Sequence, residues 1–370
     1  MKTPVRALLI TAGTEHRQPW WWTEIDHDAS RCQLDHVTLL IEGGRLKKLL
    51  SLKSLSLFVQ MVVLLFKARR RYDYIYTFEC SWLSFAAAFI QTVCFQRRPR
   101  HVILQFIMRE KLPTLKSRLK YAFMRFCFSS VYLCICSSRS EIRYYQSAFN
   151  WPSSKLAFVP LHTASCWVAS DPGPEGSYMI AAGRTFRDYA TLLAAFEAID
   201  VPLVIVAGRS NGITSTRPNI RILYDVPQDE LSGLLTGSMA IVLPLEERQI
   251  SIGQMVLLQS MALAKPVVVT RVNGTEDYVD QMRTGILVPP RDALAIRDAV
   301  LRLHQDPSLR VRLGQAARDR IRDAHLPRHY AEAVSVCLRN RRTAENRRSN
   351  GGVEVAVAIE QTGRGTHDGE

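Results

Sequence analysis

The order of apolar and polar segments in residues 239–290 constrains the fold of this chain more than any other feature. An apolar run, Ala240–Leu243, is followed by a polar loop, and a helical pattern of about three turns opens at Ser251 or Gly253. The valines at 267–269 then form a second apolar run. Strand, loop, helix and strand in this order predict a crossover between parallel strands.

The polar loop at residues 245–252 is predicted to face a ligand. Ligands of open parallel sheets bind beyond the carboxyl ends of the strands, and this loop directly follows a strand. The helix behind the loop begins with unpaired backbone N–H groups and the positive end of its dipole, which suits a phosphate. We therefore expect a phosphate group close to Gly253 and Gln254.

The rest of the chain alternates strand and helix patterns in the same way. Apolar runs predict strands near residues 5–11, 36–41, 74–78, 101–107 and 131–136, and in the second half near 179–182, 202–207, 219–224, 266–270 and 285–290. A chain of 370 residues also exceeds what a single core usually supports. The sequence therefore predicts an α/β protein with two Rossmann-like, doubly wound domains.

The boundary between the domains is predicted at a segment rich in proline and glycine. Residues 1–165 form the first domain and 178–325 the second, with a linker at 166–177 that includes DPGPEGS. A last helical pattern covers residues 326–339. The polar residues 340–370 are predicted to be disordered, because they hold too little apolar surface to form a core.

Two segments of the second domain resemble a known family. Residues 257–279, LLQSMALAKPVVVTRVNGTEDYV, and residues 285–300, GILVPPRDALAIRDAV, are similar to the nucleotide-sugar-binding half of retaining GT-B glycosyltransferases, the group called glycosyltransferase family 4. The resemblance is specific over residues 178–304 and rests on pattern alone before them. It implies two domains that face each other across a cleft, with the last helix crossing back to the first domain.

The resemblance also implies where the donor lies. In the family, the helix of this segment carries two glutamates eight positions apart; the second binds the ribose hydroxyls and the first lies by the donor sugar. This chain has Ser251 and Gln259 at those positions, after a loop about three residues longer than the family usually has. Gln259 still offers an amide to a diol, but without a charge. Tyr224 and Val226 are the candidates for contact with the nucleobase.

Two arginines are the catalytic candidates. Arg184 and Arg187 follow the strand at 179–182, just before a helix that begins at Asp188. Guanidinium groups present several fixed donors to the oxygens of a diphosphate. The family uses an arginine and, slightly later, a lysine to hold the leaving diphosphate, so the resemblance implies that Arg187 replaces the lysine. The alternative is a surface arginine that pairs with Asp188.

The first domain offers weaker candidates. Gly13 follows the first strand, where glycine lets a backbone approach a donor closely. The tryptophans at 20–22 form either a stacking platform or a loop plug. His162, at the hinge, is either catalytic or a satisfied structural histidine, and Arg109 with Glu110 form either an acceptor site or a structural pair.

No metal and no cofactor are expected. Asp26-His27-Asp28 matches a metal-binding DxD pattern, but it lies in a loop and not at the end of a buried strand. The positive groups near the diphosphate are expected to neutralise the leaving group without an obligatory metal. By resemblance, the leaving phosphate accepts the proton of the acceptor.

The net charge of +14 favours phosphate-rich partners. In residues 113–129, four cations alternate with aromatic and aliphatic side chains, as in a helix that lies on an anionic membrane surface; the alternative is a core helix with a basic, solvated side. Many family members dock on membranes through such a helix. Nucleic acid is not expected as a partner, because the cations are scattered and no recognition module is visible.

These observations predict a glycosyltransferase of the hexosyltransferase type. We expect it to move a sugar from a nucleotide-diphosphate donor to a lipid-linked or glycan acceptor, with retention, as in polysaccharide biosynthesis. The expected location is cytoplasmic, peripheral on the inner face of the plasma membrane. The alternative is a GT-B-like nucleotide- or lipid-binding assembly protein that has lost turnover, favoured by the loss of both glutamates at Ser251 and Gln259.

Overall fold

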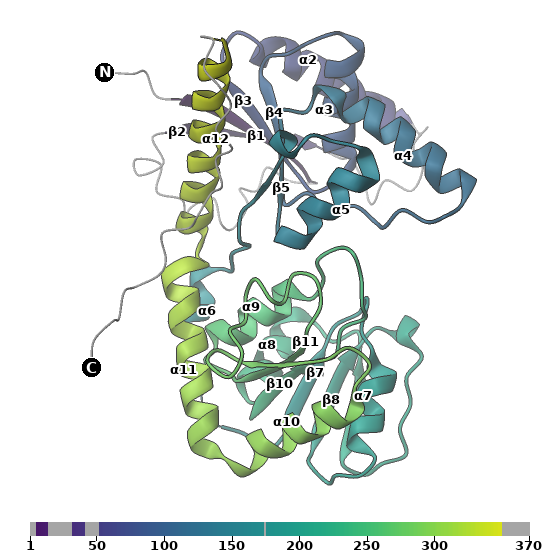
Figure 1. Cartoon of the computed structure of the whole chain (residues 1–370), viewed down its shortest axis with the longest axis vertical. Helices are drawn as coiled ribbons and strands as arrows, with labels where there is room; N and C mark the ends of the chain where they lie inside the picture. Colours follow the sequence, from purple (N-terminus) through teal and green to yellow (C-terminus); the bar gives the residue numbers. More distant parts are fainter. Residues whose placement is uncertain (1–4, 14–31, 41–51, 174, 350–370) are drawn as a thin grey trace.

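The computed structural model contains two α/β units, one above the other, with α11 and α12 running along the same side of both (Figure 1). The structure describes residues 5–13, 32–40, 52–173 and 175–349. Each unit has a six-stranded, parallel sheet. The predicted fold class, two Rossmann-like units, is therefore confirmed.

The sheet of the N-terminal unit has the strand order β2-β1-β3-β4-β5-β6. Its strands are β1 (Val5–Gly13), β2 (Cys32–Leu40), β3 (Tyr74–Phe78), β4 (Arg100–Leu104), β5 (Leu133–Cys136) and β6 (Leu156–Phe158). Its helices include α2 (Leu52–Ala68), α3 (Trp82–Val93), α4 (Leu115–Cys127) and α5 (Arg139–Phe149). Strand β4 ends three residues before its predicted end, because Gln105 has a positive φ of 51° and leaves the extended conformation.

The sheet of the C-terminal unit has the order β12-β11-β10-β7-β8-β9. Its strands are β7 (Met179–Ala182), β8 (Leu203–Ala207), β9 (Ile220–Tyr224), β10 (Ala240–Leu243), β11 (Val267–Thr270) and β12 (Ile286–Val288). Its helices are α7 (Tyr189–Phe196), α8 (Gln228–Thr236), α9 (Gln254–Ala262), α10 (Ala293–Gln305) and α11 (Pro307–Ala324). The central strands β7 and β10 are buried along their whole length, as their apolar sequence predicts.

Close packing of α11 against the end of α9 depends on one glycine. A Cβ added to Gly314 would lie 2.0 Å from the carbonyl oxygen of Ala264. Only glycine lets the two backbones approach this closely. The contact fixes α9, the helix that begins at the predicted ligand site, against the long helix that leads out of the unit.

Helix α12 (Pro327–Ser349) crosses back to the N-terminal unit. Its buried side chains, among them Tyr330 and Leu338, pack in one cluster with Leu9 of β1. The guanidinium of Arg341 lies 4.2 Å from the centre of the Tyr132 ring. The helix therefore continues ten residues past its predicted end at residue 339, and the first part of the predicted tail is helical.

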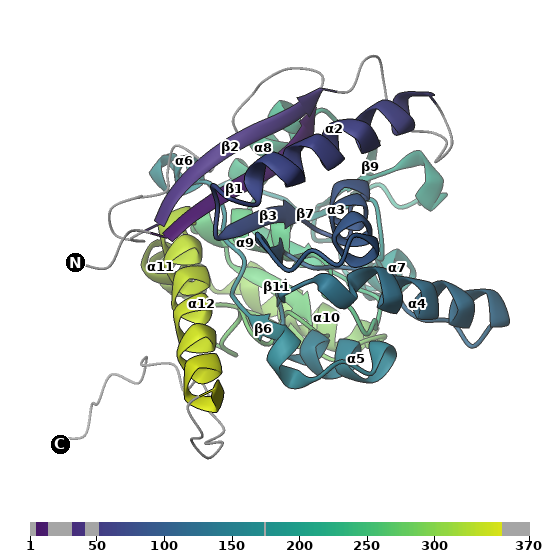
Figure 2. The same cartoon turned by 90° about the horizontal axis from the view of Figure 1, so that it is seen from above.

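The two faces of the N-terminal sheet are covered differently. Alternate residues of β1 point to opposite sides: Leu9 packs in a cluster with residues of α12, and Leu8 packs in a cluster with residues of α2 and α3. Figure 2 shows α12 on one side of the sheet and α2 and α3 on the other. Among the described residues, no helix combines the length and the hydropathy needed to cross a membrane.

Candidate functional site

The loops that follow β7 and β10 are paired at the carboxyl edge of the C-terminal sheet. Arg187 and Leu245 form an isolated antiparallel bridge. Next to this bridge, the N–H of Glu246 donates to the carbonyl oxygen of Phe186 at 3.1 Å. Because β7 and β10 are neighbours in the sheet, the two loops predicted to face the ligand lie side by side.

The start of α9 lies against the same pair of loops. Gly253 is the N-cap of the helix, and its φ of 83° is in the left-handed region that favours glycine. A Cβ at Gly253 would lie 2.9 Å from the side chain of Leu245, the residue that bridges to Arg187. The arginine-bearing loop and the helix N-terminus therefore converge, and Gly253 supplies no side chain to cap the free N–H groups.

Arg187 is turned back onto its own loop. Its Nε donates to the carbonyl oxygen of Ala182 at 3.1 Å, and its Nη1 donates to that of Thr185 at 3.0 Å. The guanidinium fills the space over Gly183, where an added Cβ would lie 2.3 Å from Nε. Burial lowers the pKa of Arg187. In this structure Arg187 braces the loop and does not pair with Asp188.

Arg184 is exposed and reaches toward the loop after β9. Its Nη2 lies 3.5 Å from the carbonyl oxygen of Val226, the residue predicted to lie by the nucleobase. The side chain of Val226 is itself buried. The hydroxyl of Tyr224 donates to the carbonyl oxygen of Ile213. Of the nucleobase candidates, the structure thus brings the backbone of Val226 closest to a catalytic candidate.

Ser251 and Gln254 lie together against the loop after β11. A Cβ added to Gly274, which has a φ of 95°, would lie 2.3 Å from Gln254 Nε2 and 2.8 Å from Ser251 Oγ. Both atoms are buried. In the described part of the chain Gln254 Nε2 has no hydrogen-bond partner, and the side chain of Ser251 interacts with the carboxylate of Glu141. An unsatisfied buried donor costs about 1–3 kcal/mol, so this site favours a polar ligand. Gln259 occupies the second turn of α9 and is half-buried.

Several candidates of the N-terminal unit lie in or beside undescribed segments. Gly13 is the last residue of β1, and its backbone pairs with Leu40 of β2. The tryptophans at 20–22 and the motif at 26–28 are outside the described residues. In the ranges that the structure describes, no group of three or more His, Cys, Asp or Glu side chains is placed to hold a metal ion.

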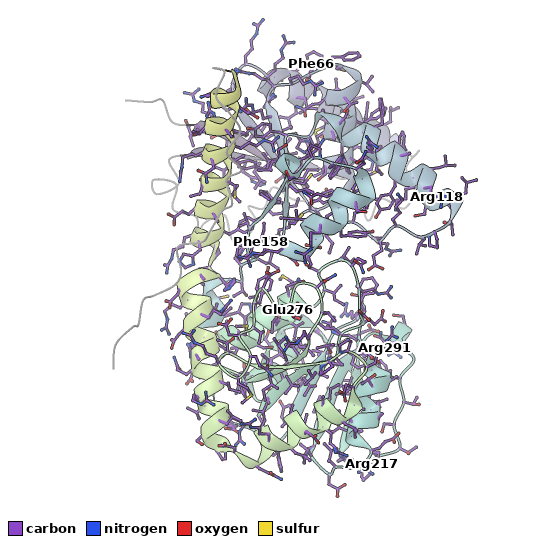
Figure 3. The ribbon with its side chains drawn as sticks, viewed as in Figure 1. Phe66, Arg118, Phe158, Arg217, Glu276 and Arg291 are labelled. Atoms are coloured by element: carbon purple, nitrogen blue, oxygen red, sulfur yellow. The ribbon has the colours of Figure 1, made fainter. Side chains whose placement is uncertain are left out.

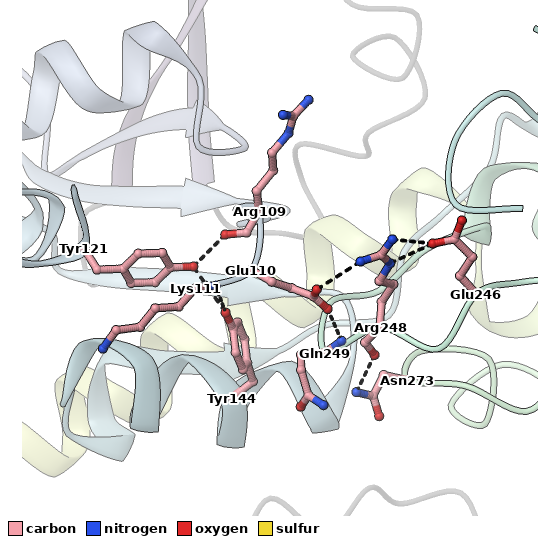
Figure 4. A network of polar contacts seen from close by, with 9 residues as sticks. All are labelled: Arg109, Glu110, Lys111, Tyr121, Tyr144, Glu246, Arg248, Gln249 and Asn273. Atoms are coloured by element: carbon pink, nitrogen blue, oxygen red, sulfur yellow. Dashed lines mark hydrogen bonds and ion pairs between the residues drawn. The ribbon is translucent and has the colours of Figure 1, made fainter. Parts of the chain in front are cut away.

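Arg248 forms a network between the two units that the sequence did not predict. Figure 4 shows its guanidinium between Glu246 and Glu110, and the N–H of Gln249 donating to the same Glu110. Arg109 points away from this group, and only its carbonyl oxygen joins the polar contacts drawn. Of the two alternatives for Arg109 and Glu110, a direct pair between them does not form: Glu110 pairs with Arg248, which is 138 residues away.

A second carboxylate of the N-terminal unit reaches the same loop. The N–H of Ser251 donates to Glu141 Oε1 at 2.8 Å, and the hydroxyl of Ser137 donates to Glu141 Oε2 at 3.3 Å. Burial raises the pKa of Glu141, while the bonds from Ser251 and Ser137 oppose that rise. No local sequence signal identifies Glu141; the only hint of these contacts is the extra length of the loop before α9.

His162 lies in the hinge against α12. Its ring centre is 4.9 Å from that of Tyr330, and the side chain is almost fully buried. Burial lowers the pKa of His162 to about 4, so the ring is neutral at pH 7. The carbonyl oxygen of the preceding residue, Leu161, lies 2.9 Å from Nδ1 of His325, the C-cap residue of α11. This placement favours the structural alternative for His162.

Comparison with known proteins identifies the part of the chain that holds this geometry. Residues 179–306 match the family model described as glycosyl transferases group 1. This segment of the chain is similar to glycosyl transferases group 1. The predicted resemblance to GT-B glycosyltransferases is thereby confirmed, while membership of family 4 stays a prediction.

Relatives of the glycosyltransferase domain align over part of their length. Alpha-D-kanosaminyltransferase of Streptomyces kanamyceticus is 30% identical over 106 residues, which are 29% of this chain and 27% of that one. D-rhamnosyltransferase WbpZ of Pseudomonas aeruginosa is 26% identical over 158 residues, 40% and 41% of the two chains. The match thus spans between about a quarter and two-fifths of these relatives.

Solved structures match nearly the whole chain in fold. Anabaena Alr3699/HepE in complex with UDP and glucose has a TM-score of 0.62 at 12% identity, over 90% of this chain and 99% of that one. Sucrose-phosphate synthase of Thermosynechococcus elongatus has a TM-score of 0.59 at 15% identity, over 94% and 100%. At these identities the likeness concerns the fold of both units around the glycosyltransferase domain.

Proposed function

We propose that this chain transfers a sugar from a nucleotide-diphosphate donor held by the C-terminal unit. One observation carries the proposal: the β7 loop, the β10 loop and the uncapped start of α9 converge, with the buried and unpaired Gln254 Nε2 beside them. The proposal is supported by the group 1 match and by a neighbour whose structure contains UDP and glucose.

The site residues have different roles in stabilising the leaving diphosphate. Arg184 is free to contact the diphosphate, and the N–H groups at the start of α9 add a positive field. Arg187 holds the loop of Arg184 in place through two backbone carbonyls. As the bond to the anomeric carbon breaks, negative charge grows on the diphosphate, and these groups stabilise it more than in the ground state. We further propose retention, with the leaving phosphate accepting the proton.

The donor is tested by a thermal-shift panel of UDP-, GDP-, TDP- and ADP-linked sugars. A ligand at about 100 times its dissociation constant stabilises the protein by roughly 2.7 kcal/mol. Arg184→Ala should lose most of the shift, and Arg322→Ala, an exposed arginine of α11, should keep it. A panel without any shift for the unmodified protein would refute a nucleotide-sugar donor.

The replacement of both family glutamates keeps a second function open: nucleotide binding without turnover, in an assembly protein. Ser251 carries no charge and therefore cannot replace the charge of the family's glutamate beside the donor sugar. It is buried, and its N–H donates to Glu141. Release of nucleoside diphosphate from the donor that binds separates the two functions. Turnover, including hydrolysis of the donor, supports the transferase, and binding without any release supports the assembly protein.

We also propose that the N-terminal unit attaches to the inner face of the plasma membrane and that the acceptor is lipid-linked or a glycan. Helix α4 buries only Tyr121 and Cys127, and its exposed apolar side chains include Leu115 at 72% exposure and Leu119 at 63%. Arg118 points away from the molecule (Figure 3). A helix with exposed apolar and basic residues suits an anionic membrane surface.

Neighbouring helices extend this surface beyond the predicted segment. The ring of Phe123 on α4 contacts Phe85 on α3 at 5.9 Å, and Phe85 stacks on Phe89 at 5.9 Å. Phe89 in turn lies 6.4 Å from Phe58 on α2. Phe66, at the end of α2, is 51% exposed. The aromatic row thus connects three helices, and we call α2, α3 and α4 the three-helix face.

A further inference from the structure

Two carboxylates of the N-terminal unit hold the loop that leads into α9. The N–H of Gln249 donates to Glu110, and the N–H of Ser251 donates to Glu141 at 2.8 Å. The two donors are backbone groups of one loop, two residues apart. Both acceptors come from the opposite unit, 139 and 110 residues away in the sequence.

Glu141 is a buried carboxylate that needs hydrogen-bond donors, and this contact supplies one of them. It has no exposed surface and lies in the first turn of α5. A buried carboxylate is destabilising unless donors surround it, and one donor to Glu141, the N–H of Ser251, belongs to the other unit. Separation of the units would remove that donor and would leave the N–H of Ser251 without its acceptor.

Arg248 joins the same loop to its neighbours. Its guanidinium pairs with Glu110 at 3.5 Å and lies 4.8 Å from the ring centre of Phe186 in the β7 loop. The side-chain amide of Asn273, in the β11 loop, donates to the carbonyl oxygen of Arg248 at 2.9 Å (Figure 4). One residue of the β10 loop thus contacts the loops of β4, β7 and β11.

We propose that Glu110 and Glu141 are positioning residues of the donor site, and we call the pair with its two N–H donors the carboxylate clasp. The inference rests on the proposed function. The clasp fixes residues 245–252 so that Ser251 Oγ, Gln254 Nε2 and the start of α9 keep their binding geometry. The donor site is therefore complete only while the N-terminal unit is docked.

The length of the loop before α9 explains why anchoring it should affect ligand affinity. A longer loop has more conformational freedom to lose when it binds a ligand, and anchoring the loop beforehand removes that loss from the binding step. The loop between β10 and α9 covers residues 244–253 and contains both N–H donors of the clasp. A hydrogen bond to a charged acceptor is strong enough to change affinity by about tenfold or more.

The test compares four variants: Glu110→Ala, Glu141→Ala, the conservative Glu141→Gln, and Glu197→Ala as a matched control on the exposed end of α7. The first measurement is amide hydrogen exchange of residues 245–252 in the ligand-free protein. The second is the dissociation constant for UDP, GDP, ADP and TDP by calorimetry. The exchange measurement is independent of which nucleotide the protein binds.

If the clasp holds the loop, the amide hydrogens of residues 245–252 should exchange at least about tenfold faster in both alanine variants. Both variants should also bind the preferred nucleoside diphosphate about tenfold more weakly. Glu141→Gln, whose carbonyl still accepts from Ser251, should recover most of both, and Glu197→Ala should change neither. If Glu141→Ala fails to fold, Glu110→Ala, whose side chain is partly exposed, decides the result.

Two results would overturn the clasp, and they differ from failure of the proposed function. Unchanged exchange in the alanine variants would mean that the two carboxylates do not hold the loop. Faster exchange with unchanged nucleotide affinity would mean that the loop contact is structural and does not position the donor site. Absence of nucleotide binding by the unmodified protein would instead refute the donor, while the exchange data would still report on the loop.

Discussion

The N-terminal and C-terminal units share a six-stranded parallel sheet but differ in what their helices expose. Of the fourteen large apolar side chains that are exposed among the described residues, eleven belong to the N-terminal unit and three to the C-terminal unit. The eleven lie on or beside the three-helix face. The same architecture thus serves two tasks: the C-terminal unit gathers polar groups at its strand ends, and the N-terminal unit presents an apolar and basic surface.

The largest expected effect concerns the three-helix face. Each cation near an anionic surface contributes about 1 kcal/mol of attraction, so removing four should weaken membrane binding by roughly a hundredfold to a thousandfold. The variant replaces with Gln the four cations Lys116, Arg118, Lys120 and Arg125. Co-sedimentation with vesicles of phosphatidylglycerol and phosphatidylcholine measures the change.

A charge-matched control separates local attraction from net charge. The control replaces with Gln four exposed arginines of the C-terminal unit, Arg283, Arg291, Arg302 and Arg322. It should leave vesicle binding nearly unchanged, because screening limits the reach of a charge to about 8–10 Å. Equal loss of vesicle binding in both variants would show that net charge, and not the three-helix face, attracts the membrane. No loss of binding in either variant would show that α4 does not bind membranes.

The next effect concerns the two arginines at the end of β7. Arg184→Ala should lower kcat by about 100-fold without lowering Tm, because the side chain is exposed and serves the leaving group. Arg187→Ala should lower kcat similarly but should also lower Tm, because the carbonyls of Ala182 and Thr185 lose their donors. Arg187→Lys should recover part of both.

Steady-state kinetics and thermal unfolding of the same preparations check this pair of predictions. Full turnover and unchanged KM in both alanine variants would show that the diphosphate binds elsewhere. The proposal that the C-terminal unit holds the donor would then be refuted. A fall in Tm for Arg184→Ala as large as for Arg187→Ala would contradict the division between a contact residue and a bracing residue.

A smaller effect is expected from Gly253→Ala. An alanine at a φ of 83° is strained by about 1–3 kcal/mol, and its Cβ would displace Leu245. The start of α9 should shift, and nucleotide affinity should fall by about tenfold. Gly173→Ala, at a φ of 66° in the linker, carries comparable backbone strain away from these loops. Calorimetry should show unchanged nucleotide affinity for that control. Equal losses of affinity in the two variants would show that Gly253 has no specific role in the donor site.

The sequence predicted local structure better in both units than it predicted contacts between them. The bounds of β3, β7 and β10 match the apolar runs, because each run is buried and is followed by a residue that ends it: Glu79, Gly183 or Pro244. Such signals lie within a few residues of the element. Glu141 and Ser251 are 110 residues apart, and no pattern near either one indicates the other.

The partial errors have the same cause. Helix α12 continues to Ser349 because Arg341 and Glu345 find Tyr132 and Arg100 on the N-terminal unit, which the polar sequence of the tail does not reveal. The sequence also does not reveal that the guanidinium of Arg187 fills the space over Gly183 and bonds two carbonyl oxygens of its own loop. In each case contacts that no residue pattern indicates decide where a cation lies.

The smallest expected effect is a pH dependence at the boundary between the units. Burial raises the pKa of Glu141 above the ordinary value of a glutamate, so the folded state favours the protonated carboxyl more than the unfolded state does. The contribution to the free energy of unfolding is therefore greatest below pH 4.5 and is lost as pH rises through the raised value. Glu141→Gln cannot ionise and should lack this slope. The difference in Tm between the two proteins should thus change by a few degrees at most between pH 4.5 and 8, in favour of the variant at the higher pH, since 1 kcal/mol moves Tm by about 2–4 °C at this size. A constant difference across that range would show that the carboxyl of Glu141 is no harder to ionise when the two units are docked than in the unfolded chain.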